Sequence, residues 1–294
     1  MPADIRTKLC SPHILVADGA LGTYLQSQGL PPGTPPELWN IEQPEIVRSL
    51  HRAYLSAGAE ILTTNTFGGN RLRLPAEING HPLGELVRRG VQLAREVAGD
   101  VAWVAGSMGP TGRLLEPLGD LSCDEAEDAF AEEAAILAEA GADLILIETM
   151  SDVLEARSAL LGARRATDLP VLVTFAFDHS GRTMMGASAE EVSREMQALG
   201  ATATGANCGQ GPEAVVVALQ QMARACSLPL IAQPNAGLPR LQATGETTWD
   251  STPDEFAERA RILIGLGARI VGACCGSTPA HIVAIRAAVD AVRA

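Results

Sequence analysis

Lysine is almost absent from this chain: of its 22 lysine and arginine residues, only Lys8 is a lysine. Lys8 precedes the first apolar segment, so no lysine is placed to form a Schiff base inside the fold. Positive charge is scarce as a whole, because 35 acidic side chains leave a formal net charge of −13. This balance excludes a basic stripe for nucleic acid, and an anionic membrane surface would repel the chain.

Long hydrophobic stretches and targeting signals are also missing. No run of about 18 apolar residues occurs, and no N-terminal segment has the pattern of a secretory signal. We therefore expect a cytoplasmic protein. Six cysteines in 294 residues are too few for a disulfide scaffold. In a reducing compartment, clustered cysteines are more often metal ligands or catalytic groups.

What the chain does contain is a regular alternation of short apolar runs with longer amphipathic segments. The apolar runs predict strands at 14–17, 59–63, 101–106, 143–148, 171–175, 203–207, 228–232 and 269–273. The amphipathic segments predict helices at 44–57, 83–98, 122–140, 152–166, 189–199, 212–226, 253–266 and 281–294. Strands that are short and continuously apolar are typical of a parallel sheet covered on both faces.

Local signals support several of these boundaries. Ser122 and Glu125 form an S-x-x-E pattern, which predicts a capping box at the start of one helix. A glycine that can end a helix in the left-handed conformation precedes each even-numbered strand. These glycines are Gly58, Gly141, Gly200 and Gly267.

Eight strand–helix units in a chain of 294 residues predict an α/β fold of the (β/α)8 class, the TIM barrel. An open, doubly wound sheet would also accept alternating units, but no glycine-rich dinucleotide fingerprint follows the first strand. No linker or low-complexity segment divides the chain, so we expect residues 1–294 to form a single domain. In a barrel, the active site lies at the carboxyl ends of the strands.

Three cysteines fall at such strand ends. Cys208 follows the sixth strand, while Cys274 and Cys275 follow the eighth, and glycines flank both segments. Three thiolates can hold a zinc ion and leave its fourth position open for a substrate. The remaining cysteines lie elsewhere and form no C-x-x-C pair: Cys10, Cys123 and Cys226.

The residues alone leave other interpretations open. Buried cysteines are often only small hydrophobic side chains, and a vicinal pair could act as a redox dithiol, although a disulfide between neighbours is strained. A zinc hydrolase or a zinc-stabilised binding domain could use the same barrel. Hydrolases normally place histidine and carboxylate ligands at strand ends, and no histidine falls at a strand end near these cysteines.

Six motifs resemble those of one family. They are Gly272-Ala-Cys-Cys-Gly-Ser-Thr-Pro279, Ala206-Asn-Cys-Gly209, Asp18-Gly-Ala-Leu-Gly-Thr23, Thr64-Asn-Thr-Phe67, Glu148-Thr149 and Pro234-Asn-Ala-Gly-Leu-Pro239. Over nearly the whole chain they resemble the zinc-dependent homocysteine S-methyltransferases, which include the homocysteine-binding domain of cobalamin-dependent methionine synthase and betaine–homocysteine methyltransferase. The resemblance is closest to the methionine-synthase branch. It implies transfer of a methyl group from an external donor to the thiol of L-homocysteine, giving methionine.

The resemblance also implies a metal centre. Cys208, Cys274 and Cys275 would bind Zn²⁺, and the homocysteine sulfur would take the open fourth position. Zinc coordination would ionise that thiol, which is only a few per cent thiolate when free at pH 7. Asn235 either fills the fourth position before the substrate arrives or is an ordinary turn residue.

A substrate-binding role is implied for four further residues. Asp18 and Glu148 would hold the ammonium group of homocysteine. Backbone amides around Gly19 and Thr64 would hold its carboxylate.

No motif identifies the methyl donor. The possibilities are S-methylmethionine, S-adenosylmethionine, a betaine-like cation, and a methyl-corrinoid protein. The sequence shows neither a folate-binding second barrel nor a corrinoid domain. An alternative is therefore that the chain is the homocysteine-binding module of a multi-component corrinoid- or folate-dependent methionine synthase.

Overall fold

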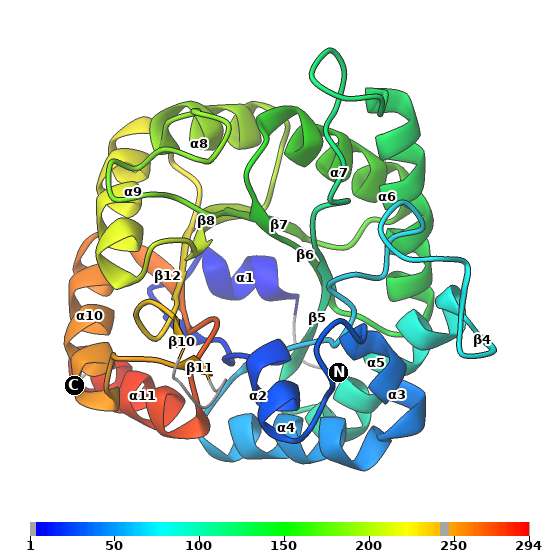
Figure 1. Ribbon diagram of the computed structural model, residues 1–294. Helices are drawn as coiled ribbons and strands as arrows, with labels where there is room; N and C mark the ends of the chain where they lie inside the picture. Colours follow the sequence, from blue (N-terminus) through cyan, green and yellow to red (C-terminus); the bar gives the residue numbers. More distant parts are fainter. Residues whose placement is uncertain (1–3, 242–246, 294) are drawn as a thin grey trace.

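The computed structural model describes residues 4–241 and 247–293, and it confirms the barrel. Eight parallel strands pair in the order β1, β12, β9, β8, β7, β6, β5 and β2. Their bounds are Leu15–Val16 (β1), Ile61–Thr63 (β2), Trp103–Met108 (β5), Leu144–Met150 (β6), Val171–Phe175 (β7), Ala203–Cys208 (β8), Leu230–Pro234 (β9) and Ala268–Val271 (β12). A bridge between Ala17 and Ile61 closes the sheet on itself, which rules out the open doubly wound alternative (Figure 1).

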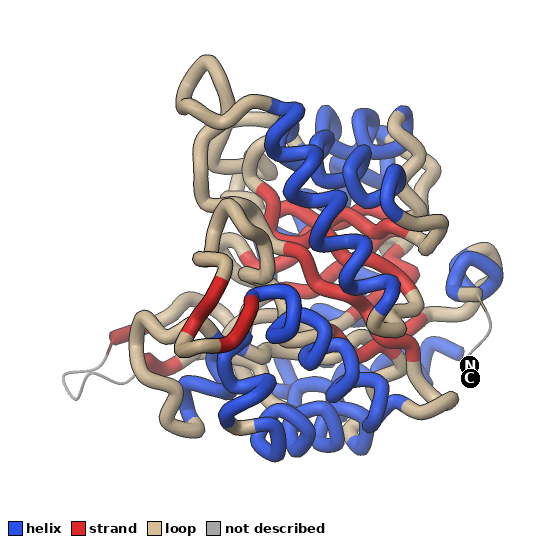
Figure 2. Tube along the Cα trace, turned by 90° about the vertical axis from the view of Figure 1, so that its right-hand side faces the viewer, coloured by secondary structure: helices blue, strands red, loops and turns tan. Residues whose placement is uncertain are grey.

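A ring of helices encloses the strands (Figures 1 and 2). They are α4 Pro44–Ser56, α5 Leu83–Ala98, α6 Cys123–Glu139, α7 Val153–Ala166, α8 Ala189–Ala198, α9 Pro212–Ala225, α10 Pro253–Gly265 and α11 Pro279–Arg293. Each predicted helix is present, although the predicted last residue, Ala294, lies outside the described part of the chain. Within that part, no helix combines the length and apolar composition of a membrane span.

The predicted helix boundaries have the expected local causes, with one correction. Gly58 and the three equivalent glycines before even-numbered strands have φ between 78° and 104°. Ser122 Oγ accepts a hydrogen bond from Glu125 N at 3.2 Å, but the structure gives only this half of the predicted capping box. The Glu125 carboxylate instead lies 3.7 Å from the Arg113 guanidinium. Complete capping boxes begin α8 and α10.

Several short elements were not predicted. They are α1 Ile5–Leu9, α2 Gly22–Ser27, a 3-10 turn at Pro36–Leu38, α3 Trp39–Glu42, and the hairpins β3 Glu77–Ile78 with β4 His81–Pro82 and β10 Arg240–Leu241 with β11 Thr247–Thr248. Figure 1 looks down the barrel onto α1, and Figure 2 shows α1 at the end opposite the loops that follow the strands. Ile5 and Leu9 are buried there against the barrel interior, so α1 closes the amino end of the barrel.

Inward-facing positions along the strands form layers that change in character from one end to the other. The apolar interior includes Ala105 of β5, Leu146 of β6 and Ile231 of β9. Two residues further on, the same face of each strand carries a polar side chain, because side chains alternate with period two. These are Ser107, Glu148 and Gln233, and all three line a cavity. The carboxyl ends therefore hold a polar layer above an apolar one.

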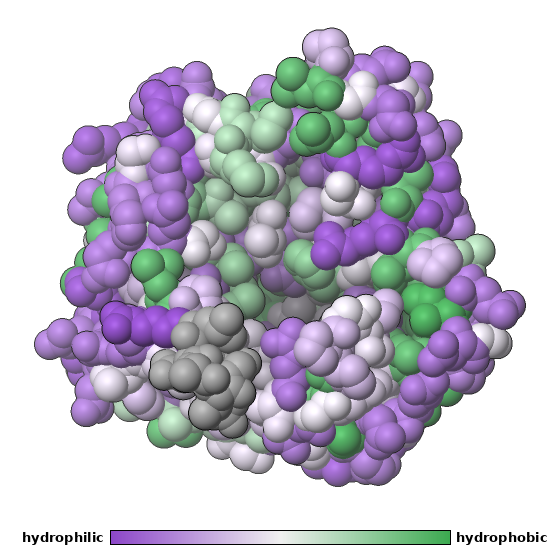
Figure 3. All heavy atoms as spheres, viewed as in Figure 1, coloured by the Kyte–Doolittle hydropathy of each residue, from purple (hydrophilic) through white to green (hydrophobic). Residues whose placement is uncertain are grey.

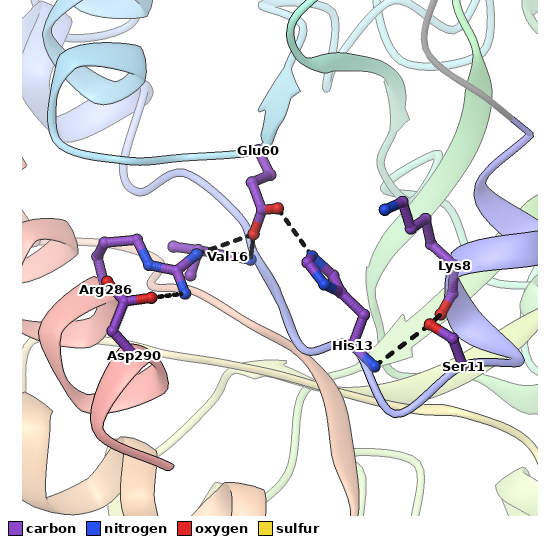
Figure 4. A network of polar contacts seen from close by, with 7 residues as sticks. All are labelled: Lys8, Ser11, His13, Val16, Glu60, Arg286 and Asp290. Atoms are coloured by element: carbon purple, nitrogen blue, oxygen red, sulfur yellow. Dashed lines mark hydrogen bonds and ion pairs between the residues drawn. The ribbon is translucent and has the colours of Figure 1, made fainter. Parts of the chain in front are cut away.

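An ion pair and hydrogen bonds of Glu60 hold the opposite end together (Figure 4). Glu60 Oε1 lies 2.9 Å from His13 Nε2, while Glu60 Oε2 lies 2.9 Å from Arg286 Nη1 and accepts a hydrogen bond from Val16 N at 3.2 Å. Glu60 immediately precedes β2, and Arg286 belongs to α11. The contacts therefore tie the first strand, the second strand and the last helix together where the barrel closes.

Candidate functional site

The polar layer forms the floor of a cavity of about 510 Å³ at the carboxyl ends of the strands. Figure 3 looks onto this face of the molecule, which is hollowed near its centre. The outer wall comes from the segments that follow β1 and β2, including Glu37, Phe67 and Arg73. The Arg73 guanidinium lies 5.2 Å from the centre of the Phe67 ring. The cavity thus extends from the strand ends toward a wall that carries the Glu37 carboxyl group and the Arg73 guanidinium group.

The three strand-end cysteines meet on this floor. Cys208 ends β8, and Cys274 and Cys275 follow β12, with β9 lying between these two strands. The Sγ atom of Cys275 is 3.8 Å from that of Cys208 and 4.0 Å from that of Cys274, and all three lie within 4.8 Å of one another. A hydrogen bond of 2.8 Å from Cys274 N to Pro234 O fixes the second cysteine segment against β9. The prediction that these cysteines converge is confirmed.

The donor set suits a zinc ion. With Zn–S bonds of about 2.3 Å, tetrahedral geometry places two ligand sulfurs about 3.8 Å apart, which matches the observed separations. The trio is the only group of three or more potential His, Cys, Asp or Glu ligands among the described residues. It includes no histidine or carboxylate, so it lacks the mixed ligand set usual in zinc hydrolases.

The charges on the three thiols are coupled. Hydrogen bonds from the thiols of Cys274 and Cys275 lower the pKa of Cys208 to about 3, and the hydrogen bond to Cys208 raises the pKa of Cys275 to about 12. The same contacts raise the pKa of Cys274. One thiolate therefore opposes ionisation of the other two. A bound divalent cation offsets this repulsion and allows all three to ionise.

Asn235, the predicted occupant of the fourth metal position, lies beside the cluster. Its side chain contacts Cys208, and its Nδ2 donates a hydrogen bond of 3.1 Å to Gly209 O. Its Oδ1 is buried and has no hydrogen-bond partner within the described residues. An amide oxygen in this state is a suitable metal-ligand atom, because leaving it unsatisfied is costly.

Asp18 lies on the cavity floor and is 1% exposed. Its Oδ2 accepts a hydrogen bond from Thr63 N and its Oδ1 accepts one from Thr63 Oγ1, both at 2.7 Å. Burial raises the pKa of Asp18 to about 7, although the bonds from Thr63 favour the ionised form. Each oxygen keeps a second lone pair for a ligand.

Glu148 faces the same cavity from β6. Its Oε1 accepts a hydrogen bond of 2.5 Å from Ser107 Oγ, and burial raises the pKa of Glu148 to about 7. The charge of Glu148 also contributes to the raised pKa of Asp18. Two carboxylates that repel each other across one cavity form a favourable site for a cationic group such as an ammonium ion.

The two predicted backbone amides differ in availability. Thr64 N donates a hydrogen bond of 2.9 Å to Ala105 O, and the Thr64 hydroxyl accepts one from Ser107 N at 2.9 Å. The backbone N–H and the hydroxyl of Thr64 therefore both form hydrogen bonds to β5, although the residue lines the cavity. Gly19 also lines it, and a side chain there would lie 2.4 Å from Ser277 Oγ. Within the described residues, Gly19 N donates no backbone hydrogen bond, so of the two it is better placed to leave its amide to a ligand.

Sequence reasoning assigned no role to three residues of the floor. Thr63 holds Asp18, Ser107 holds Glu148, and Asn207 contacts both Glu148 and Cys274. The period-two alternation of the strands could have found Ser107 and Asn207, because each lies two residues beyond an inward-facing position.

With this geometry in place, comparison with known proteins gives a clear result. The model of the family described as homocysteine S-methyltransferase matches residues 15–289. The chain belongs to this family. The resemblance inferred from the sequence motifs is therefore confirmed over nearly the whole chain.

Among curated relatives, two mycobacterial methionine synthases are 35% identical to this chain. The match to the protein of Mycobacterium tuberculosis (strain ATCC 25618 / H37Rv) spans 303 residues, covering 96% of this chain and 25% of that protein. The match to the protein of Mycobacterium leprae (strain TN) covers 94% and 24%. The chain thus spans about a quarter of the length of the curated relatives it matches.

Among solved structures, the homocysteine methyltransferase MmuM from Escherichia coli covers almost the same length. Its metallated form is 26% identical, has a TM-score of 0.77, and covers 97% of this chain and 99% of its own. Its apo form is 27% identical with a TM-score of 0.73, covering 94% and 95%. The carboxyl transferase domain of Rhizobium etli pyruvate carboxylase, at 15% identity and a TM-score of 0.53, shares the fold alone.

Proposed function

We propose that this chain transfers a methyl group from a donor to the sulfur of L-homocysteine, giving methionine. The observation that carries the proposal is the convergence of three cysteines on the floor of a cavity that also holds two buried carboxylates, in a member of the homocysteine S-methyltransferase family. In the reaction, the thiol proton is lost, a sulfur lone pair attacks the methyl carbon, and the bond from methyl to donor breaks.

We assign zinc binding to Cys208, Cys274 and Cys275, with Asn235 beside them as the fourth ligand in the absence of substrate. Zinc, when bound, supplies a positive centre that favours the ionised form of a neighbouring thiol. Ionising a thiol whose pKa is about 1.5 units above the ambient pH is worth roughly 2 kcal/mol. The remaining acceleration has to come from aligning the sulfur, the methyl group and the leaving group in the cavity.

The amino-acid head group is assigned to the opposite part of the floor. Asp18 and Glu148 would accept hydrogen bonds from the substrate ammonium, and pairing with a cation would return both carboxyls to their ionised forms. The Gly19 amide would bind the substrate carboxylate, with Thr64 forming the adjoining wall. This arrangement holds the two ends of one small molecule at fixed points.

The donor would occupy the outer part of the cavity. A volume of about 510 Å³ lies in the range that accepts drug-sized ligands and exceeds what one small amino acid needs. The outer wall offers the Glu37 carboxylate and the Arg73 guanidinium. The donor classes to be compared are S-methylmethionine, S-adenosylmethionine, betaine and methylcobalamin.

The test is methionine formation by the zinc-loaded protein from homocysteine and each of these donors in turn. We expect turnover with at least one donor and none after chelation of the metal. Absence of methionine with every donor, from protein shown to carry about one zinc per chain, would overturn the proposal.

A second candidate function is favoured by the comparison with methionine synthases, of which the chain covers only a quarter. In that case the chain is the homocysteine-binding module of a multi-component, corrinoid- or folate-dependent synthase. Turnover with methylcobalamin but not with either sulfonium donor would support this candidate. Turnover with a sulfonium donor alone would contradict it.

A further inference from the structure

Asn207 joins the two halves of the site, although nothing so far assigns it a role. It is the last residue but one of β8, is 1% exposed, and immediately precedes Cys208. Its side chain crosses β7 to reach the end of β6, where it meets Thr149, the neighbour of Glu148. One buried amide therefore contacts both the strand that carries a predicted metal ligand and the strand that carries a predicted substrate carboxylate.

The orientation of this amide follows from its partners. Asn207 Oδ1 accepts hydrogen bonds from Thr149 N at 2.9 Å and from Thr174 Oγ1 at 2.8 Å. A backbone N–H can only donate, so the atom facing it is the oxygen. Asn207 Nδ2 then donates to Thr149 Oγ1 at 2.7 Å, and it lies 3.4 Å from Glu148 Oε2. Thr149 is thus bound twice, through its backbone and through its side chain.

Thr149 needs such support because its backbone is strained. Its φ is 63°, in the left-handed region that β-branched residues rarely adopt. The pairing of β6 with β7 is irregular at the same place, with a register shift between Ile147 and Met150. Such irregularities redirect side chains next to active sites. Glu148 lies inside this irregular segment, so its direction depends on the conformation of Thr149.

We propose that Asn207 is a positioning residue, which clamps Thr149 in its left-handed conformation and thereby holds the Glu148 carboxylate toward the substrate ammonium. The inference rests on the role proposed above for Glu148. Because the clamp is built on β8 beside Cys208, it also fixes the carboxylate relative to the cysteine cluster. The side chain of Asn207 then sets the distance between the Glu148 carboxylate and the cysteine cluster.

The main test replaces Asn207 and measures homocysteine binding separately from metal binding. In Asn207→Ala, the KM for homocysteine should rise roughly 10- to 100-fold, as is typical when a residue supporting a site is removed. Zinc should stay near one per chain by elemental analysis, since all three cysteines remain. A crystal structure of the variant should show Thr149 outside the left-handed region.

A second substitution that restores the KM distinguishes the proposed clamp on Thr149 from a direct contact between Asn207 and the substrate. Glycine adopts positive φ without steric cost, so Thr149→Gly removes the need for a clamp. Adding it to Asn207→Ala should lower the KM severalfold compared with Asn207→Ala alone. A loss that Thr149→Gly does not relieve would mean that Asn207 acts on the substrate directly, and would overturn the clamp.

A matched pair of milder variants controls for lost stability. Thr174 and Thr204 are both fully buried, and each hydroxyl donates one hydrogen bond, to Asn207 Oδ1 and to Val173 O respectively. Thr174→Val should raise the KM for homocysteine a fewfold, because the amide loses one of the bonds that orient it. Thr204→Val should lower the melting temperature similarly but leave the KM unchanged.

Equal KM values in the two valine variants, or a KM within about twofold of wild type in folded Asn207→Ala, would overturn the inference. Either result can be distinguished from failure of the proposed function. If the wild-type protein makes no methionine with any donor, the function fails, and the conformation of Thr149 in the Asn207→Ala crystal structure still decides whether the clamp exists.

Discussion

The two ends of the barrel are built from the same strands but carry opposite properties. At the amino end, α1 covers an apolar interior, and Glu60 forms an ion pair with Arg286 and a hydrogen bond with His13. At the carboxyl end, inward positions are polar, burial raises the pKa values of Asp18 and Glu148, and the backbone is strained at Thr149 and Cys208. On β6, Leu146 and Glu148 face the same interior two residues apart, yet the first is core and the second lines the cavity.

The difference shows how the molecule can tolerate an unfavourable site. Left-handed Thr149 and Cys208 lie at the carboxyl end, as does Asn235 Oδ1, which has no hydrogen-bond partner in the part of the chain that the structure describes, and each costs stability. The apolar layer of the barrel interior beneath them includes none of these three residues. Changes at the carboxyl end should therefore alter chemistry more than folding, and changes at the amino end should do the reverse.

The largest effect is expected from the cysteines. Cys208→Ala should reduce zinc from about one per chain to nearly none, and methionine formation should fall by more than the roughly 100-fold seen when only a supporting residue is removed. The melting temperature should change by only a few degrees because the core is apolar. Elemental analysis and the methionine assay measure these effects.

The exposed Cys123 at the start of α6 provides the matched control, and Cys123→Ser should change neither zinc nor activity. Full zinc content in Cys208→Ala would break the assignment of the metal centre to the carboxyl end.

A smaller effect is expected from the carboxylates. Glu148→Gln, and separately Asp18→Asn, should raise the KM for homocysteine roughly 10- to 100-fold, because a hydrogen bond between charged groups is worth about 1.5–3 kcal/mol. Zinc content should not change. The exposed Glu258 on α10 offers a control with the same change of charge, and Glu258→Gln should leave the KM as it is. Wild-type kinetics in both floor variants would refute the ammonium site.

The raised pKa values of Asp18 and Glu148, both about 7, predict a pH dependence. Below pH 7 these carboxyls are largely protonated and cannot pair with an ammonium group, so affinity should increase as the pH rises through 7. Methionine is the suitable ligand for calorimetry, because it keeps the ammonium group but has no thiol to titrate. The Glu148→Gln variant should show a flatter profile, and an unchanged slope would contradict the assignment.

The same shifts affect folding in the opposite direction. Between about pH 4 and 7, the folded protein holds protons that the unfolded chain has released, so the contribution of these carboxyls to stability decreases as the pH rises.

The smallest effect on function is expected at the amino end. Arg286→Met should lower the free energy of unfolding by roughly 1–2 kcal/mol, because it leaves Glu60 with one partner fewer in a half-buried network. Urea unfolding measures this change, while zinc content and the KM for homocysteine should remain at wild-type values. Arg52, which is exposed and 3.9 Å from Glu45, is the control, since Arg52→Met should cost less than about 0.5 kcal/mol. A large change in KM for Arg286→Met would show that the two ends are coupled.

Much of the architecture could be predicted from the sequence. The alternation of apolar runs with amphipathic segments identified the eight strand–helix units, since hydrophobic periodicity reports which residues each element buries. Parallel strands that alternate with helices must place their carboxyl ends on one side, so Cys208 and Cys274 could be brought together by chain order alone. Family motifs then added the chemistry of the site.

Only the tertiary structure decided how the site is supported. The strands β5, β6 and β9 end two residues later than predicted, because backbone pairing continues to Met108, Met150 and Pro234 after the apolar run stops. The contact between Asn207 and Thr149 joins residues 58 positions apart, and the burial of Asp18 and Glu148 depends on segments packed from elsewhere in the chain. Local periodicity encodes which face of a strand is buried, whereas hydrogen-bond partners and pKa values depend on which distant groups come within a few ångströms, and only the closed barrel determines that.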